Sequence, residues 1–338
     1  MRRTATGAPH TVALQQLRGA LGRTRIARVV MKGKILLIAN LSAAAGGATR
    51  RWDKLLEDLA SRGVRADHVL TESSGHAISL AREAAQSYDV IAAVGGDGTV
   101  NEVASGILLA GETSSALAII PLGTGNDAAQ LLGIRSVEDA FKALVSGRTR
   151  TIDAIEVHCH NAGKEHTRYA LLYAAVGFAG ELLKRTTPAV KRLFGPRYCY
   201  SVGFFRALLG FRSPTIRVRC DEREFHGRMF LVSAGNAEIV GAGTMRLSPG
   251  AKVDDGQMNV NVIEDLGRLE TARWFPKVLK GTHTTHPKVS YLAATSVTIE
   301  CEAVMEVQLD GELYGHTPAT FQVRPGAIRV IASHDWIG

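Results

Sequence analysis

An apolar run that ends directly in glycines is the feature that most limits how this chain can fold. Residues 90–94 (Val-Ile-Ala-Ala-Val) have the composition of a strand buried on both faces of a parallel sheet. The run continues into Gly95-Gly-Asp-Gly-Thr99, and residues 101–109 have a helical pattern. Between a buried strand and a helix, such a turn binds phosphate, because the backbone approaches the anion and the helix amides point at it. This stretch predicts an α/β fold with a phosphate site.

Short β-rich runs alternate with amphipathic helices from Lys34 to about Arg150, which predicts a parallel sheet with crossover helices. We expect strands at 35–38, 68–70, 90–94 and 117–120, and helices around 52–59, 77–85, 101–109 and 137–145. Beyond Thr151 the segments alternate or are β-branched, and a single helical interruption stands at 181–209, which predicts a mainly β domain. The pattern leaves open which domain the last β-like runs, 321–323 and 328–331, join.

These patterns divide the chain into four parts. We expect a basic extension at 1–30, an α/β nucleotide-binding domain at 31–150, a mainly β domain at 151–310, and a segment at 311–338 that can return to the first domain. The acid-free, Arg-rich start is similar to a mitochondrial transit peptide. Because Met31-Lys-Gly-Lys34 directly precedes an apolar strand, we interpret residues 1–30 as an upstream extension instead.

The net charge of +8 is concentrated in two blocks. Six arginines stand in the first thirty residues and nine basic residues between Leu182 and Cys220, and neither block contains an acid, so the rest is net acidic. This distribution argues against a general nucleic-acid binder. No apolar run approaches the ~20 residues of a membrane span. Four dispersed cysteines without a Cys-x-x-Cys pair argue against a zinc site or disulfide framework and favour a cytoplasmic location.

A second glycine turn, Pro121-Leu-Gly-Thr-Gly-Asn-Asp127, follows the next predicted strand. In the first turn, Asp97 would repel phosphates unless a cation lay between them, so it implies Mg²⁺ or an ordered network around the carboxylate. The alternative is a tight strand-to-helix turn with Asp97 as helix cap. Two such turns at successive strand ends favour phosphate binding. The chain has no Gly-x-x-x-x-Gly-Lys-Ser/Thr motif, which excludes a Walker-type NTPase.

Five motifs occur in a fixed order between residues 34 and 330. They are Gly95-Gly-Asp-Gly-Thr-Val-Asn101, Gly123-Thr-Gly-Asn-Asp127, Thr151-Ile-Asp153, Asp254-Asp-Gly256 and Leu309-Asp-Gly-Glu312. This series resembles the diacylglycerol kinase catalytic family, in its soluble bacterial, YegS-like branch. The first motif alone is also similar to NAD kinases and phosphofructokinases. One departure is that Asn40 precedes leucine, where the family has Asn-Pro.

The resemblance implies a two-domain, NAD-kinase-like fold, with an α/β nucleotide-binding domain, a β-sandwich domain and the active site between them. ATP would be the phosphoryl donor, Asp97 would organise Mg²⁺ and ATP, and Glu312 would take the proton from a lipid hydroxyl. Without the resemblance, the Asp-Gly before Glu312 indicates a hairpin turn. A hairpin turn and a catalytic role for Glu312 are compatible, because a rigid turn can position a base. The nucleotide-binding residues carried over are Thr71, Gly95, Gly96, Asp97, Gly98, Thr99, Val100, Asn101, Thr124, Asn126 and Asp127.

A further acidic turn looks like the structural metal loop of the family. There Asp255 would supply a carboxylate, and Lys252 and Gln257 backbone carbonyls, which is an oxygen set suited to Mg²⁺. The alternative is an ordinary Asp-Gly turn.

Residues 182–212 interleave cations with aromatic and aliphatic side chains. This mixture predicts peripheral contact with an anionic membrane surface. Single-stranded nucleic acid is the other reading, but the chain has no RNA-binding motif, so we expect no nucleic-acid partner. The structural alternative is that the aromatic rings pack into the β domain and leave only the charges exposed.

We therefore expect a cytoplasmic, peripherally membrane-associated lipid kinase that transfers the γ-phosphate of ATP to diacylglycerol or a related lipid, giving phosphatidic acid or its equivalent. One alternative is a soluble-substrate kinase of the NAD-kinase type. Another is a non-catalytic, nucleotide-dependent membrane-binding protein. The sequence leaves open which lipid is the acceptor and whether the chain forms a homodimer.

Overall fold

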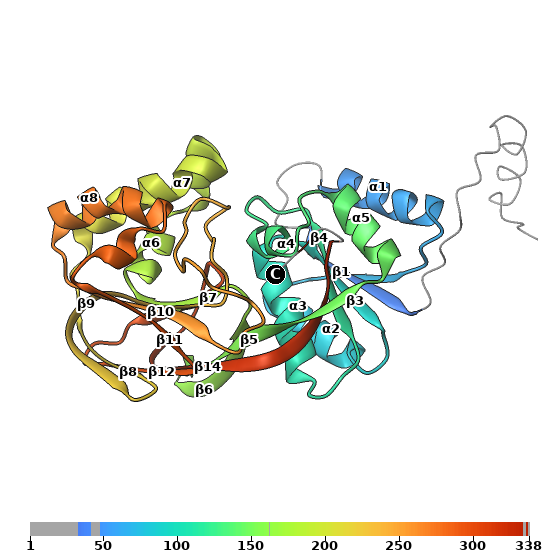
Figure 1. Ribbon diagram of the computed structural model, residues 1–338. Helices are drawn as coiled ribbons and strands as arrows, with labels where there is room; N and C mark the ends of the chain where they lie inside the picture. Colours follow the sequence, from blue (N-terminus) through green and yellow to red (C-terminus); the bar gives the residue numbers. More distant parts are fainter. Residues whose placement is uncertain (1–32, 42–47, 162, 334–335, 337–338) are drawn as a thin grey trace, which may run out of the picture.

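Buried apolar strands at the start of the chain form a parallel sheet with helices on both faces (Figure 1). The computed structural model describes residues 33–41, 48–161, 163–333 and 336. The sheet has the order β2-β1-β3-β4, and in Figure 1 α1 and α5 lie on one side of it and α2 and α3 on the other. Its elements are β1 (Ile35–Ala39), α1 (Ala48–Ser61), β2 (Asp67–Leu70), α2 (His76–Ala84), β3 (Val90–Gly95), α3 (Asp97–Leu109), β4 (Ala116–Pro121), α4 (Asp127–Leu131) and α5 (Val137–Ser146).

Helix α3 corrects one expectation, because it begins at Asp97 rather than near residue 101. Gly96 is the N-cap residue, with extended φ and ψ angles, so Asp97 lies in the first turn and is not the cap of this helix. An acidic residue in the first turn is stabilised by the positive end of the helix dipole. Much of the predicted glycine turn is therefore the first turn of a helix, and its N–H groups face the end of β3.

The second domain contains ten strands and three α-helices among the residues described. Strands β7, β13, β14, β12, β8 and β9 pair in that order, and β9 pairs with β7 again, so the strands form a closed ring around a second apolar core. The elements are β5 (Thr149–Asn161), β6 (Lys164–Ala170), β7 (Tyr173–Gly177), α6 (Phe178–Arg185), α7 (Pro188–Gly210), β8 (Thr215–Cys220), β9 (Arg223–Gly235), β10 (Met258–Glu264), α8 (Arg268–Leu279), the 3-10 turn η1 (His283–Thr285), β11 (Val289–Ala294), β12 (Ser296–Cys301), β13 (Glu306–Leu309) and β14 (Glu312–Ile331).

Helices α6 and α7 occupy the predicted helical interruption, and α7 changes direction at Gly195, where φ is 68°. Helix α8 was not predicted. It contains Pro276, and Leu269 and Leu279 at its two ends are exposed, so its sequence lacks the apolar stripe that marks a buried helix. Within the part of the chain that the structure describes, no helix combines the length and apolar character that crossing a membrane requires.

Strands β5 and β14 run through both domains as one antiparallel ribbon (Figure 1). The pairing extends from His160 with His316 in the second domain to Thr149 with Ile331 in the first. The end of β14 also joins the parallel sheet, because Arg329 pairs with Ala116 of β4. The last β-like runs of the sequence therefore belong to one strand that connects the two sheets. This arrangement confirms the predicted fold class of an α/β domain joined to a β-sandwich-like domain.

Candidate active site

The two glycine turns pack backbone against backbone at the ends of β3 and β4. A Cβ atom on Gly123 would lie 2.4 Å from the Cα atom of Gly96, so the contact requires glycine. Asp97 ties the turns together, because its Oδ1 accepts a hydrogen bond of 3.1 Å from the N–H of Ala128 in α4. Burial, with a smaller contribution from the nearby charges of Asp127 and Asp310, raises the pKa of Asp97 to about 6.

Asp310 and Gly311 form a two-residue hairpin turn between β13 and β14. Leu309 pairs with Glu312, and the φ angles of Asp310 and Gly311 are 46° and 90°, the left-handed geometry that Asp-Gly favours. The Asp310 carboxylate is buried and accepts hydrogen bonds from the N–H groups of residues 171, 172 and 173, at 2.9 to 3.0 Å. The predicted hairpin is thus also a rigid mount for Glu312.

Asn101 of α3 connects this hairpin to the first domain. Its side-chain amide donates to Asp310 Oδ2 at 2.9 Å and to the carbonyl oxygen of Tyr169 at 2.8 Å. Burial raises the pKa of Asp310, while its four hydrogen-bond donors favour the ionised form. The helix that carries the first glycine motif is therefore bonded directly to the turn that carries Glu312.

Glu312 extends from the second domain to the first turn of α3. A Cβ atom on Gly98 would lie 2.1 Å from Glu312 Oε1, so the carboxylate occupies the space that any other residue at position 98 would fill. The close approach holds a carboxylate from β14 against the N-terminus of a helix from the other domain. That is a favourable position for a negative charge.

Two hollows meet at Glu312, and both are lined by Gly96, Gly98 and Glu312. The Thr71 hollow has a volume of about 270 Å³, and its other lining residues are Asn40, Thr71, Glu72, Ser73, Ser74, Thr99 and Glu102. The Tyr200 hollow has a volume of about 200 Å³, and its other lining residues are Asp97, Gly123, Thr124, Gly125, Asp127, Tyr173, Cys199, Tyr200, Gly241, Ala242, Asp310 and Gly311.

The nucleotide-binding residues expected from the sequence separate into two groups. Those that line a hollow are Thr71, Gly96, Asp97, Gly98, Thr99, Thr124 and Asp127. Gly95, Val100, Asn101 and Asn126 line neither. Val100 is buried in the first core, and the Asn126 side chain bonds back to the N–H and carbonyl of Gly123, at 3.1 and 2.9 Å. The side chains of Val100, Asn101 and Asn126 support the turns from within the protein, because they pack against or hydrogen-bond to other protein groups.

Asp127 links the second glycine turn to the second domain. Its carboxylate accepts hydrogen bonds from the N–H groups of Ala242 and Gly243, at 2.9 and 2.8 Å. Burial raises its pKa, and the N–H donors oppose that effect. The loop that contains Ala242 thereby forms part of the wall of the Tyr200 hollow.

The expected metal loop is a tight turn held by protein hydrogen bonds. Asp255 Oδ1 accepts from the N–H of Gln257 at 3.1 Å, and Asp153 accepts from the N–H groups of Gly256 and Gly326, both at 2.7 Å. Lys252 lies on the same loop and lines a separate hollow. Among the residues that the structure describes, no three His, Cys, Asp or Glu side chains group as metal ligands. The Asp-Gly turn is present, and a metal at this loop stays a prediction.

Several residues that shape the site carry no local sequence signal. Tyr173 and Tyr200 come from β7 and α7, and both line the Tyr200 hollow. Burial raises the pKa of both phenols, so they are neutral at physiological pH. Glu102 accepts hydrogen bonds from the N–H groups of Gly75 and Ala77, which anchors the start of α2 beside the Thr71 hollow. The second-domain motifs identified from the sequence were the Asp254-Asp-Gly256 loop and the Asp-Gly turn that carries Glu312, and neither indicates Tyr173 or Tyr200.

Family models match both domains. A diacylglycerol kinase catalytic domain matches residues 34–157, and a YegS C-terminal NAD kinase beta sandwich-like domain matches residues 179–332. A diacylglycerol kinase of Staphylococcus saprophyticus is 30% identical over 307 residues, covering 90% of this chain and 97% of that protein. A diacylglycerol kinase of Staphylococcus epidermidis is 32% identical over 293 residues, covering 86% of this chain and 89% of that protein.

Solved structures share the fold. A diacylglycerol kinase structure from Bacillus anthracis has a TM-score of 0.67 at 24% identity and covers 90% of this chain and 99% of its own. Yeast NADH kinase has a TM-score of 0.51 at 13% identity, with 90% and 85% covered. With both domain models matched and relatives aligned over nearly their whole length, the chain belongs to the diacylglycerol kinase catalytic family.

Proposed function

We propose that this kinase transfers the γ-phosphate of ATP to the hydroxyl group of diacylglycerol or a related long-chain lipid. The observation that carries the proposal is the position of Glu312, whose carboxylate lines both the Thr71 hollow and the Tyr200 hollow. Phosphoryl transfer needs a donor and an acceptor on opposite sides of the reacting phosphate and a base beside the attacking oxygen. A carboxylate that borders two adjoining hollows meets this requirement.

The Thr71 hollow suits the nucleotide. The first-turn N–H groups of α3 have no partner within the helix, as in every α-helix, and they point toward this end of the site. The N–H of Thr71 donates to the carbonyl of Ala39, and the N–H of Asn40 donates to that of Val94, so the ends of β2 and β1 are fixed beside α3. Asn40 after β1 and Thr71 after β2 therefore line this hollow beside a helix N-terminus, which is an arrangement that binds phosphates.

The carboxylates at the junction fit a divalent cation. Asp97 is partly buried, its pKa is raised, and the charges of Asp127 and Asp310 contribute to that shift. Negative charge gathered around a partly buried carboxylate is stabilised when a cation binds there. Asp97, which lines the Tyr200 hollow together with Glu312, is the residue that would hold Mg²⁺ with the phosphates of ATP, and Glu312 keeps the role of base. When bound, Mg²⁺ would neutralise charge on the transferring phosphoryl group.

The Tyr200 hollow suits the acceptor. Tyr173, Cys199 and Tyr200 line it, and Glu312 lines both this hollow and the nucleotide hollow. An acceptor hydroxyl in this hollow would donate a hydrogen bond to the Glu312 carboxylate. Glu312 would then take the proton as the oxygen attacks the γ-phosphorus, and ADP would leave with the bridging oxygen.

The proposal is tested by phosphate transfer from labelled ATP with Mg²⁺, using the full-length protein. The acceptors are diacylglycerol, monoacylglycerol, a sphingoid base, ceramide and phosphatidylglycerol in mixed micelles, with NAD in parallel. We expect label on diacylglycerol or a related lipid. Glu312→Gln should abolish transfer while ATP binding persists, and Glu300→Gln, on the exposed face of β12, should have no effect. Label on NAD alone, or ATP binding without transfer to any acceptor, would overturn the proposal.

A further inference from the structure

Helices α7 and α8 lie side by side on the second domain (Figure 1). They share an aromatic inner layer. The ring of Phe204 in α7 stacks on that of Phe275 in α8, with centroids 4.0 Å apart. Phe178 in α6 stacks on Phe230 of β9, with centroids 4.4 Å apart. These buried rings attach the helices to the sheet. For these rings, the alternative given above holds, in which the aromatic side chains pack into the β domain. They leave the outer faces of α7 and α8 exposed.

The outer faces are apolar as well. Among the residues that the structure describes, seven of the eleven exposed large hydrophobic side chains belong to these two helices. Leu209 and Leu269 are 72% and 85% exposed, which is extreme for leucine. Single exposed hydrophobics are ordinary on a protein surface, but a group on two packed helices marks an interaction site. The seven are Leu193, Phe194, Tyr198, Phe205, Leu209, Leu269 and Leu279; we call them, with the cations below, the α7–α8 surface.

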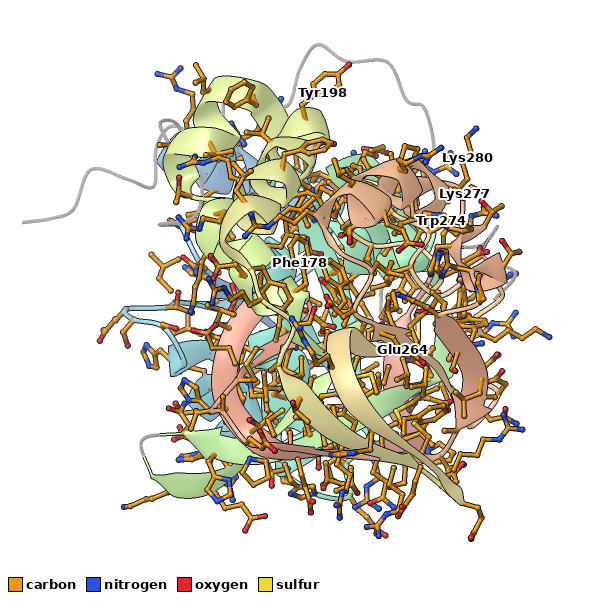
Figure 2. All side chains as sticks on the ribbon, turned by 90° about the vertical axis from the view of Figure 1, so that its left-hand side faces the viewer. Phe178, Tyr198, Glu264, Trp274, Lys277 and Lys280 are labelled. Atoms are coloured by element: carbon orange, nitrogen blue, oxygen red, sulfur yellow. The ribbon has the colours of Figure 1, made fainter. Side chains whose placement is uncertain are left out.

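Cations are interleaved with these side chains. Helix α7 contains no acidic residue, and the one acidic residue of α8, Glu270, accepts a hydrogen bond of 3.0 Å from the buried His286. The Lys277 ammonium lies 4.3 Å from the ring centroid of Trp274, which pairs a cation with an indole ring. In Figure 2, Tyr198, Trp274, Lys277 and Lys280 lie toward one end of the domain, and Glu264 lies below them. Among the side chains that the structure describes, the exposed cations on and beside the two helices include Arg206, Arg212, Arg268, Arg273, Lys277 and Lys280.

We propose that the α7–α8 surface binds the face of a bilayer that contains anionic lipids. Apolar side chains enter the boundary between headgroups and acyl chains, while lysine and arginine remain with the phosphates. A second copy of this chain fits less well, because a symmetric contact would place the cations of one copy against those of the other. Two adjacent helices form the surface, so it presents a broad face. Single-stranded nucleic acid would instead need a narrow groove.

The same helix carries the surface and part of the acceptor hollow. Tyr198 is exposed on the α7–α8 surface, while Cys199 and Tyr200, the next two residues, line the Tyr200 hollow. Binding at this surface would place the entrance for a lipid hydroxyl next to the bilayer. This last step rests on the proposed function, whereas membrane binding itself does not.

Co-sedimentation of the full-length protein with vesicles tests the proposal. The vesicles are phosphatidylcholine alone and phosphatidylcholine mixed with phosphatidylglycerol. We expect binding to the mixed vesicles that weakens as salt rises. Leu269→Glu and Lys277→Glu should each lower the partition coefficient, by about tenfold for the leucine, because an apolar contact is lost and a repelled charge is gained. The matched controls, Ala60→Glu and Lys54→Glu on the exposed face of α1, should bind as the wild type does.

A short-chain diacylglycerol, supplied below its micelle concentration, separates this proposal from the proposed function. Variants that lose vesicle binding should still phosphorylate that dispersed acceptor, which also shows that they are folded. Phosphorylation of bilayer lipid without vesicle binding would refute membrane binding by the α7–α8 surface and would leave the proposed kinase activity intact. Vesicle binding without phosphate transfer to any lipid would refute the proposed kinase activity and would leave the membrane-binding proposal intact. The membrane proposal also fails if the variants dissociate a dimer or lose binding to single-stranded DNA while binding vesicles normally.

Discussion

Replacing Gly98 with alanine should separate the activity of this kinase from its stability. The new Cβ atom would lie 2.1 Å from Glu312 Oε1, and an ordinary contact needs at least 3.4 Å, so the carboxylate must move by more than 1 Å. The atom that moves is the end of a flexible side chain, so the fold accommodates it. Alanine is also the better helix former, which adds up to about 1 kcal/mol to the free energy of unfolding.

Activity should respond in the opposite direction. A displacement of about 1 Å at a reacting group costs on the order of 100-fold in rate, and loss of a general base costs roughly 100- to 10,000-fold. We therefore expect kcat for lipid phosphorylation to fall at least 100-fold in Gly98→Ala, while the urea unfolding midpoint stays equal or rises. The measurements are steady-state kinetics with the lipid acceptor and equilibrium unfolding.

A double-mutant cycle identifies the cause. If Gly98→Ala acts by displacing Glu312, adding it to Glu312→Gln should reduce kcat little further, because the group it disturbs is already inactive. An ATP affinity measured alongside detects any obstruction of the nucleotide hollow. The reasoning is refuted if Gly98→Ala retains kcat within a few-fold of the wild type, or if the two substitutions reduce kcat additively.

Three other predictions concern the carboxylates and the glycine contact. Asp310→Asn should lower the unfolding free energy by about 1–3 kcal/mol, because an amide NH₂ would face donors that now meet a carboxylate; urea titration measures it, with the exposed Asp254→Asn as control. Folded Asp97 has a pKa of about 6, whereas an ordinary aspartate has a pKa of 3.8, so between these pH values the folded state holds a proton that the unfolded state has released. Stability should therefore fall by up to about 3 kcal/mol as pH rises through this window, and Asp97→Asn should remove that slope in urea titrations at several pH values. Gly123→Ala should destabilise the protein by roughly 1–3 kcal/mol, because its Cβ would meet the backbone of Gly96 at 2.4 Å; a thermal melt equal to that of the wild type would contradict the close packing of the two turns.

The features that the sequence predicted are those whose physical cause is local. The buried run before Gly95 and the left-handed Asp310-Gly311 turn each depend on a few neighbouring residues, and both occur where expected. Helix α8 was missed because Pro276 and exposed leucines mask its period. The inward orientation of Asn101 was missed because its partner, Asp310, stands 209 residues away. Tyr173 and Tyr200 reach one hollow only through tertiary packing, which no periodicity encodes.

The pairing of β14 with β4 has a consequence for how the protein can be made. Arg329 pairs with Ala116, so the edge of the sheet at β4 stays unpaired until a strand more than 200 residues further along the chain has been synthesised. A fragment that ends with the matched catalytic domain, at residue 157, would leave that edge exposed and available for pairing with another chain. The same late strand begins with Glu312, so the strand that covers the sheet edge also carries the proposed base. A truncation that deletes residues 312–331 would therefore remove both the proposed base and the cover of the sheet edge.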